Sequence, residues 1–185
     1  MNLEAALLAE HSRRQRDLIV AWVGGEPRRF AKVVGVMLGD APVLAQRAAW
    51  VVSVVAEAHP AWSRPHLVRL LDHLARPKLH PAVSRAIFRL LQFVPIPGTL
   101  EGRVLAVALA GLGGPTAIAV KVCAMTVLKR LAADSPALLA EIRQLIDEQL
   151  PTASPAFRAR ARREFRPTLQ SSRPTNRKLP SSQGL

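Results

Sequence analysis

Four histidines, His59, His66, His73 and His80, recur at intervals of seven residues, and histidine is the commonest metal ligand among side chains. Prolines interrupt this segment, so one continuous helix cannot carry all four. Only His66 and His73 can share a helix, where two turns separate them by about 10.5 Å, too far for one zinc ion. We therefore expect histidines that face solvent or cap turns, with no metal site and no cofactor.

The other reactive side chains form no catalytic grouping. Cys123 lies in an apolar helical run without a histidine within one turn, which predicts a buried, inert thiol. Asp147 and Glu148 are neighbours on a predicted helix and point in different directions. The glycine-rich segment 111–116 lacks the lysine and the preceding strand of a phosphate-binding loop. We expect a protein that is not an enzyme.

A recurring basic position is the strongest pattern in the chain. Its four members are separated by 38, 36 and 37 residues, and two further arginines follow four residues after a member; the set is Arg47, Arg85, Lys121 and Arg158, with Arg89 and Arg162. Stacked repeats would place these side chains in a row, as a candidate basic groove for an acidic protein segment or a nucleic-acid backbone. The structural alternative is that each one hydrogen-bonds carbonyls or a carboxylate of the neighbouring unit.

The same period organises the elements that carry this row. Pairs of apolar helical runs joined at turns recur at residues 42–58 with 64–75, 81–94 with 99–112, and 116–133 with 136–150, and a last basic helix follows Ser154-Pro155. Helix pairs with a period in this range are typical of an α-solenoid, in which each pair buries its apolar face on the next. We predict an all-α fold of about four repeats plus a terminal helix, with a less regular first unit as the cap.

Composition agrees with this fold. The 185 residues are 49% hydrophobic and only 4% aromatic, without tyrosine, which favours close-packed helices. We expect one repeat domain over residues 1–166 and a disordered basic tail over residues 167–185. The formal net charge is +13, and residues 151–185 hold eight basic residues against Glu164. Such an excess attracts polyanions at long range.

The location of the protein is also an expectation from sequence. One cysteine permits no intrachain disulfide, the first residues lack the basic start of a signal peptide, and the longest uncharged run, 104–120, has glycines and Pro115 in its centre. We expect a soluble cytoplasmic protein without a membrane span.

The tryptophans could stack on a nucleic-acid base. Trp50, however, is in register with Phe88, Ala124 and Ala161, which predicts a packing position filled by different volumes in each unit. Trp62, in a proline-containing turn, is expected to be partly exposed.

Six motifs resemble a group of small bacterial HEAT-like (armadillo-type) repeat proteins. They are EHS (10–12), QRAAW (46–50), EAHP (57–60), RLLQFVPIP (89–97), AVKVCAMTVL (119–128) and EQLPTASPAFRARARR (148–163). This group has no established activity. The repeat, the lack of a catalytic grouping and the general use of solenoid concave faces for docking favour a non-enzymatic scaffold that docks a protein or peptide partner on its concave face. Nucleic-acid binding through the basic groove and tail is the alternative.

The resemblance also raises an enzyme hypothesis, because AlkD-like DNA glycosylases use the same architecture. Those enzymes have a tryptophan followed four residues later by the catalytic aspartate. Here only Trp22 and Glu26 approximate that spacing, across a Gly-Gly break, whereas Trp50 is followed by Val54. Glycosylase activity is therefore the less favoured alternative.

Overall fold

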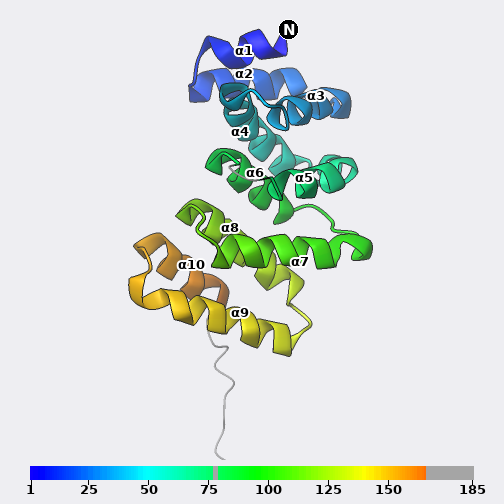
Figure 1. Ribbon diagram of the computed structural model, residues 1–185. Coiled ribbons are helices and arrows are strands. Elements are labelled where there is room, and N and C mark those ends of the chain that lie inside the picture. Colours follow the sequence, from blue (N-terminus) through cyan, green and yellow to red (C-terminus); the bar gives the residue numbers. More distant parts are fainter. Residues whose placement is uncertain (77–78, 166–185) are drawn as a thin grey trace, which may run out of the picture.

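The computed structural model describes residues 1–76 and 79–165, so the predicted tail over 167–185 lies outside the described residues. This part of the chain is helical and stacks from the N-terminus to α10 (Figure 1). The helices are α1 (Leu3–Ala9), α2 (Arg13–Val23), α3 (Pro27–Met37), α4 (Pro42–Ala58), α5 (Leu67–Leu74), α6 (Pro81–Leu91), α7 (Gly98–Gly113), α8 (Ile118–Leu131), α9 (Pro136–Gln149) and α10 (Pro155–Phe165), with 3₁₀ segments η1 (Pro60–His66) and η2 (Leu150–Thr152). The predicted all-α solenoid is confirmed.

The helices form two layers. In the first layer α4, α6, α8 and α10 pack on one another in succession, and α2 continues this layer at the N-terminal end. In the second layer α3, η1 with α5, and α7 contact one another less, and α9 follows at the C-terminal end (Figure 1). Across the layers the closest packing joins α3 to α4 and α7 to α8. These partners are consecutive helices that the sequence placed in neighbouring units.

Local sequence signals set most helix starts. The hydroxyl oxygens of Ser12, Ser135 and Ser154 accept hydrogen bonds from the backbone N–H groups three residues ahead, at 3.1–3.3 Å. This satisfies one of the unpaired donors of a first helical turn. Gly24 ends α2 with a φ of 51°, a conformation that side chains with a Cβ rarely adopt.

One segment differs from the expectation from sequence. A helix was predicted over 64–75 after an open turn, but residues 60–66 form η1 and the α-helix begins only at Leu67. Pro60 and Pro65 lack backbone N–H groups, so the segment cannot make the regular α-helical ladder and adopts the tighter 3₁₀ winding instead.

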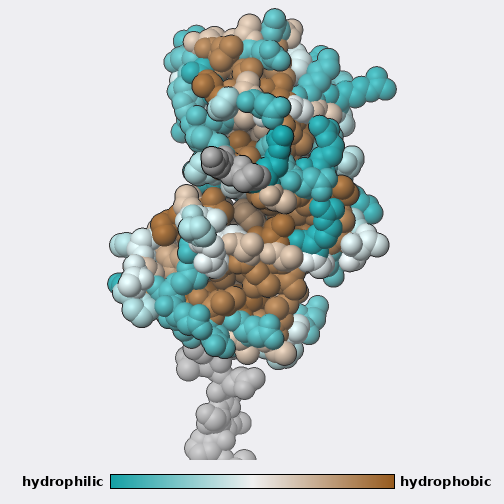
Figure 2. Space-filling model, in the orientation of Figure 1, coloured by the Kyte–Doolittle hydropathy of each residue, from teal (hydrophilic) through white to brown (hydrophobic). Residues whose placement is uncertain are grey.

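A continuous core runs the length of the stack. It consists mainly of Val, Leu, Ile and Ala, with Phe30, Phe88, Phe157 and Phe165 as its large aromatic members. Burying one such aliphatic or aromatic side chain contributes about 1.5–3 kcal/mol relative to leaving it exposed. In Figure 2, apolar side chains also gather on the surface over α7 and α9. Within the described residues, the helices are all too short or too polar to cross a membrane.

Candidate binding site

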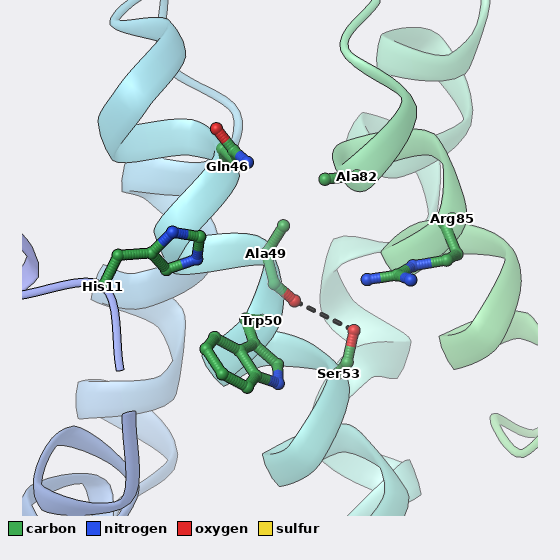
Figure 3. A pocket seen from close by; sticks show the side chains of 7 residues that line it. All are labelled: His11, Gln46, Ala49, Trp50, Ser53, Ala82 and Arg85. Carbon is green, nitrogen blue, oxygen red and sulfur yellow. Dashed lines mark hydrogen bonds between the residues drawn. The ribbon is translucent and has the colours of Figure 1, made fainter. Parts of the chain in front are cut away.

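A cavity of about 330 Å³ opens between α4 and α6 in the first layer. Figure 3 shows its walls: α4 supplies most of them, α6 supplies the opposite side, and the α1–α2 turn closes one end. Its lining residues are His11, Gln46, Ala49, Trp50, Ser53, Ala82 and Arg85. The cavity therefore combines two alanine side chains and several polar side chains with the indole ring of Trp50.

Trp50 is half-buried at this cavity, so the prediction of a packing position is wrong for this member of the register. Its counterparts Phe88, Ala124 and Ala161 are buried as predicted. The difference arises at the N-terminal end, where α4 meets the α1–α2 region instead of a regular repeat. The guanidinium of Arg16 lies 4.8 Å from the centre of the Trp50 ring, and the His11 ring meets it edge-on at 5.6 Å.

Arg85 is the charged group of the cavity. Its side chain extends from α6 toward α4 (Figure 3) and is exposed, and it makes no hydrogen bond or ion pair with the residues that the structure describes. Opposite it, the hydroxyl of Ser53 donates to the carbonyl oxygen of Ala49 at 2.9 Å. The cavity thus has a cationic donor group without an anionic counterpart among its lining residues.

One turn further along the same two helices, the corresponding arginine does have a counterpart. Arg89 on α6 forms an ion pair with Glu57 on α4, and both side chains are about half exposed. The candidate row therefore contains one neutralised and one unneutralised arginine on α6.

Three other members of the predicted row donate hydrogen bonds to uncharged oxygen atoms of the chain. Arg47 donates to the Leu7 carbonyl oxygen at 2.7 Å, near the end of α1. Arg158 donates to the carbonyl oxygen of Pro151 at 3.1 Å. Lys121 donates to the amide oxygen of Gln149 at 2.6 Å. At Arg47 and Arg158 the acceptor is a backbone carbonyl of the preceding unit, as the structural alternative predicts, whereas Lys121 contacts a side-chain amide of the helix paired with its own.

Arg162 is separate from the cavity between α4 and α6. It is exposed and lines a different cavity of about 280 Å³ between α9 and α10, together with Asp147 and Phe165. Arg85 and Arg89 share one face of α6, and Arg158 and Arg162, also four residues apart, share one face of α10. Of these four residues, Arg85 lines the cavity between α4 and α6, and Arg162 lines the cavity between α9 and α10.

Arg130 is a structural basic residue that the repeat pattern did not identify. It lies in the last turn of α8, and its Nη1 donates to the carbonyl oxygens of Leu91 and Val94 at 3.0 and 2.7 Å. Leu91 is the last residue of α6, whose final C=O groups have no partner within the helix, and Val94 lies in the turn that follows. A basic residue in a last turn was the only available signal, and it does not reveal a contact 36–39 residues away.

Cys123 is half-buried instead of fully buried as predicted. Burial raises the pKa of its thiol, although the charge of Arg160 and a hydrogen bond with Gln92 act in the opposite direction. A raised pKa leaves little thiolate at neutral pH, which disfavours nucleophilic chemistry.

The histidines at intervals of seven take unrelated positions. The ring of His59 stacks on that of Trp62 with centroids 4.0 Å apart, and Trp62 is half-buried. The ring of His66 meets Phe30 edge-on, and burial lowers the pKa of His66, with a smaller contribution from Arg69. His73 is buried beside Arg76, whose Nη1 lies 3.4 Å from its Nδ1. In the described residues no three His, Cys, Asp or Glu side chains are placed to hold a metal ion.

Trp22 and Glu26, whose spacing approximates the tryptophan–aspartate motif of the glycosylases, do not line the cavity between α4 and α6. Trp22 is half-buried and has the guanidinium of Arg29 5.4 Å from its ring centre. Glu26 is exposed and occupies the N-cap position of α3. The two side chains therefore belong to different helices, which the Gly24 turn separates.

In the comparison with protein-family models, the HEAT repeat domain matches residues 3–166. The match spans most of the chain, and the stacked helices show the architecture it implies, so the chain belongs to the HEAT repeat family and is a helical-repeat scaffold. Comparisons with curated proteins and with solved structures gave no match.

Proposed function

We propose that this chain is a binding scaffold without catalytic activity, which docks a segment of a protein partner on the face formed by α4, α6, α8 and α10. Helices on the inner side of a bent stack lie closer together than those on the outer side, and α4, α6, α8 and α10 are the more closely packed layer. The extended inner face of a solenoid is the surface that such proteins commonly use for binding.

The observation that carries the proposal is the cavity between α4 and α6. It places a half-buried tryptophan, Trp50, beside an exposed arginine, Arg85, within reach of a hydroxyl and an amide side chain. Tryptophan and arginine are enriched among the residues that dominate binding energy at protein interfaces. A cavity of about 330 Å³ suits one or two side chains of a docked segment.

The contacts of the basic residues favour a peptide over a nucleic-acid backbone. Nucleic-acid binding needs several cations that neutralise successive phosphates. Here Arg47, Lys121 and Arg158 donate to groups of this chain, and Arg89 is paired with Glu57. Hydrogen bonds to neutral oxygens hold the first three side chains in place, and Arg89 is neutralised by its ion pair, so among the described residues Arg85 is the candidate whose guanidinium is free at this cavity. One free guanidinium beside an aromatic wall suits a discrete side chain better than a polyanion.

The proposal can be tested by selecting displayed random peptides of about 12 residues on the full-length chain; extended, such a peptide spans about 40 Å, enough to cross several packed helices. Amide NMR shifts caused by a selected peptide should concentrate on residues of α4 and α6, including Gln46 and Ala82. Arg85→Glu should abolish the shifts, whereas Arg28→Glu, a charge reversal at an exposed site on α3, should preserve them.

Selected peptides whose shifts fall on α7 and α9, or binding that Arg85→Glu leaves unchanged, would contradict the proposed face. Circular dichroism of each variant controls for loss of the helical fold. The absence of any selected peptide would contradict peptide docking itself.

A further inference from the structure

Two pairs of residues face each other across α4 and α6, one helical turn apart, and each pair has an arginine on α6. In the first pair, Glu57 of α4 holds Arg89 of α6 in an ion pair. Four residues earlier on each helix are Ser53 and Arg85, which both line the cavity between α4 and α6. Residues four apart lie on the same face of a helix. Ser53 therefore lies opposite Arg85, one turn before the position where Glu57 lies opposite Arg89.

The chain supplies the carboxylate at only one of the two positions. Ser53 has a short neutral side chain, and its hydroxyl hydrogen is directed to the Ala49 carbonyl oxygen of its own helix. Among the described residues no aspartate or glutamate lines the cavity, whereas the cationic Arg85 does. The position opposite Arg85 is therefore open and lies in a positive environment.

We propose that this position receives the carboxylate of an aspartate or glutamate side chain of the docked segment. The carboxylate of the docked segment would form an ion pair with Arg85, as Glu57 does with Arg89. This inference rests on the proposed function and specifies the chemistry that the cavity selects.

The walls of the cavity support this selection. Ala49, Ala82 and the ring of Trp50 line the cavity together with Arg85. A docked segment that packs on these apolar groups would exclude water from the guanidinium, and a charge-assisted hydrogen bond is stronger where water is excluded. Gln46 adds an amide that can donate to a second carboxylate oxygen. A lysine side chain would be repelled by Arg85, and an apolar one would bury its guanidinium without a partner.

The chain offers a direct test, because the missing carboxylate can be supplied in cis. Ser53→Glu places an acid opposite Arg85 with the geometry of the Glu57 and Arg89 pair, and should weaken binding of the selected peptides about tenfold or more. Ser53→Gln is the matched control: it adds the same volume without the charge and should retain most of the binding. Circular dichroism should show the same helical content in both variants.

The second measurement compares the sequences of the peptides selected on the wild-type chain and on Arg85→Gln. We expect aspartate or glutamate at one fixed position of the wild-type set, and loss of that preference in the Arg85→Gln set. Replacing that residue by glutamine or asparagine in a synthetic peptide should weaken its binding to the wild type about tenfold and have little effect on Arg85→Gln.

The outcomes separate this inference from the proposed function. Peptides that bind α4 and α6 without a fixed acidic position, or equal effects of Ser53→Glu and Ser53→Gln, would overturn the carboxylate position while leaving peptide docking intact. Tight oligonucleotide binding that Arg85→Gln weakens would overturn it in favour of a phosphate site. Failure to select any peptide would instead overturn the proposed function.

Discussion

Arg130 near the end of α8 donates a 2.7 Å hydrogen bond to the carbonyl oxygen of Val94, beyond the end of α6. Its guanidinium also reaches the Leu91 carbonyl oxygen. One side chain therefore connects two successive helices of the first layer and satisfies acceptors that α6 cannot satisfy itself.

Replacing this residue should destabilise the stack. Arg130→Ala leaves the Leu91 and Val94 carbonyl oxygens without this donor, and we expect the free energy of unfolding to fall by about 1–3 kcal/mol. Urea denaturation followed by circular dichroism measures the change. Arg28→Ala, at an exposed arginine of α3, is the control and should change stability by less than about 0.5 kcal/mol. Equal effects of the two substitutions would show that the contact contributes nothing specific.

Gly111 and Gly102 on α7 should respond oppositely to alanine. A Cβ at Gly111 would lie 2.8 Å from the ring of the buried Phe88, so Gly111→Ala should cost about 1–3 kcal/mol. A Cβ at Gly102 would meet no atom within 4 Å, so Gly102→Ala should stabilise the helix by up to about 1 kcal/mol.

Thermal or urea unfolding of the two variants checks these signs. Adding Phe88→Leu to Gly111→Ala should recover part of the loss, because the smaller side chain removes the clash. If Gly111→Ala proved neutral, the packing of Phe88 against α7 would be looser than the structure indicates.

The buried histidine on α5 predicts a loss of stability in mild acid. Burial, and then the charge of Arg76, lower the pKa of His73 below its ordinary value of 6.5, while Asp40 acts in the opposite direction. As the pH falls below 6.5, the unfolded chain therefore binds this proton more readily than the folded chain. The stability present above that pH is then progressively lost.

Urea midpoints at about pH 7.5 and about pH 5.5 measure this effect. The difference between the two midpoints should be smaller in His73→Gln than in the wild type. Some difference should remain, because burial also lowers the pKa of His66. An identical pH dependence in the variant would exclude His73 as its source.

Nucleic-acid affinity should reside mainly in the C-terminal part of the chain. Residues 167–185 contain three basic residues, Arg173, Arg177 and Lys178, and no acidic one, whereas several basic residues of the stack are engaged in contacts. We expect weak oligonucleotide binding by the full chain that decreases steeply with salt and is largely lost in a 1–166 truncation. Fluorescence anisotropy over a salt series measures it. Binding that the truncation retains would indicate a phosphate-binding surface on the stack.

Much of the fold was determined by sequence signals that act over one or two turns. Recurring apolar runs marked the helices, and Ser154-Pro155 marked the start of the last one, which the structure confirms. The spacing of the basic positions gave the repeat. Such signals suffice because each helix start depends on neighbours in sequence, and a solenoid stacks its units in chain order.

The candidate site depended on tertiary structure. Arg47, Arg85, Lys121 and Arg158 are equivalent by spacing, but their partners come from different elements, and only the packed stack determines which of them has one. Trp50 matches a core position in register, yet it is half-buried because its neighbours belong to the irregular first unit. The sequence thus determined a helical-repeat stack with a basic excess, whereas long-range packing determined that Arg85 faces an open cavity beside Trp50.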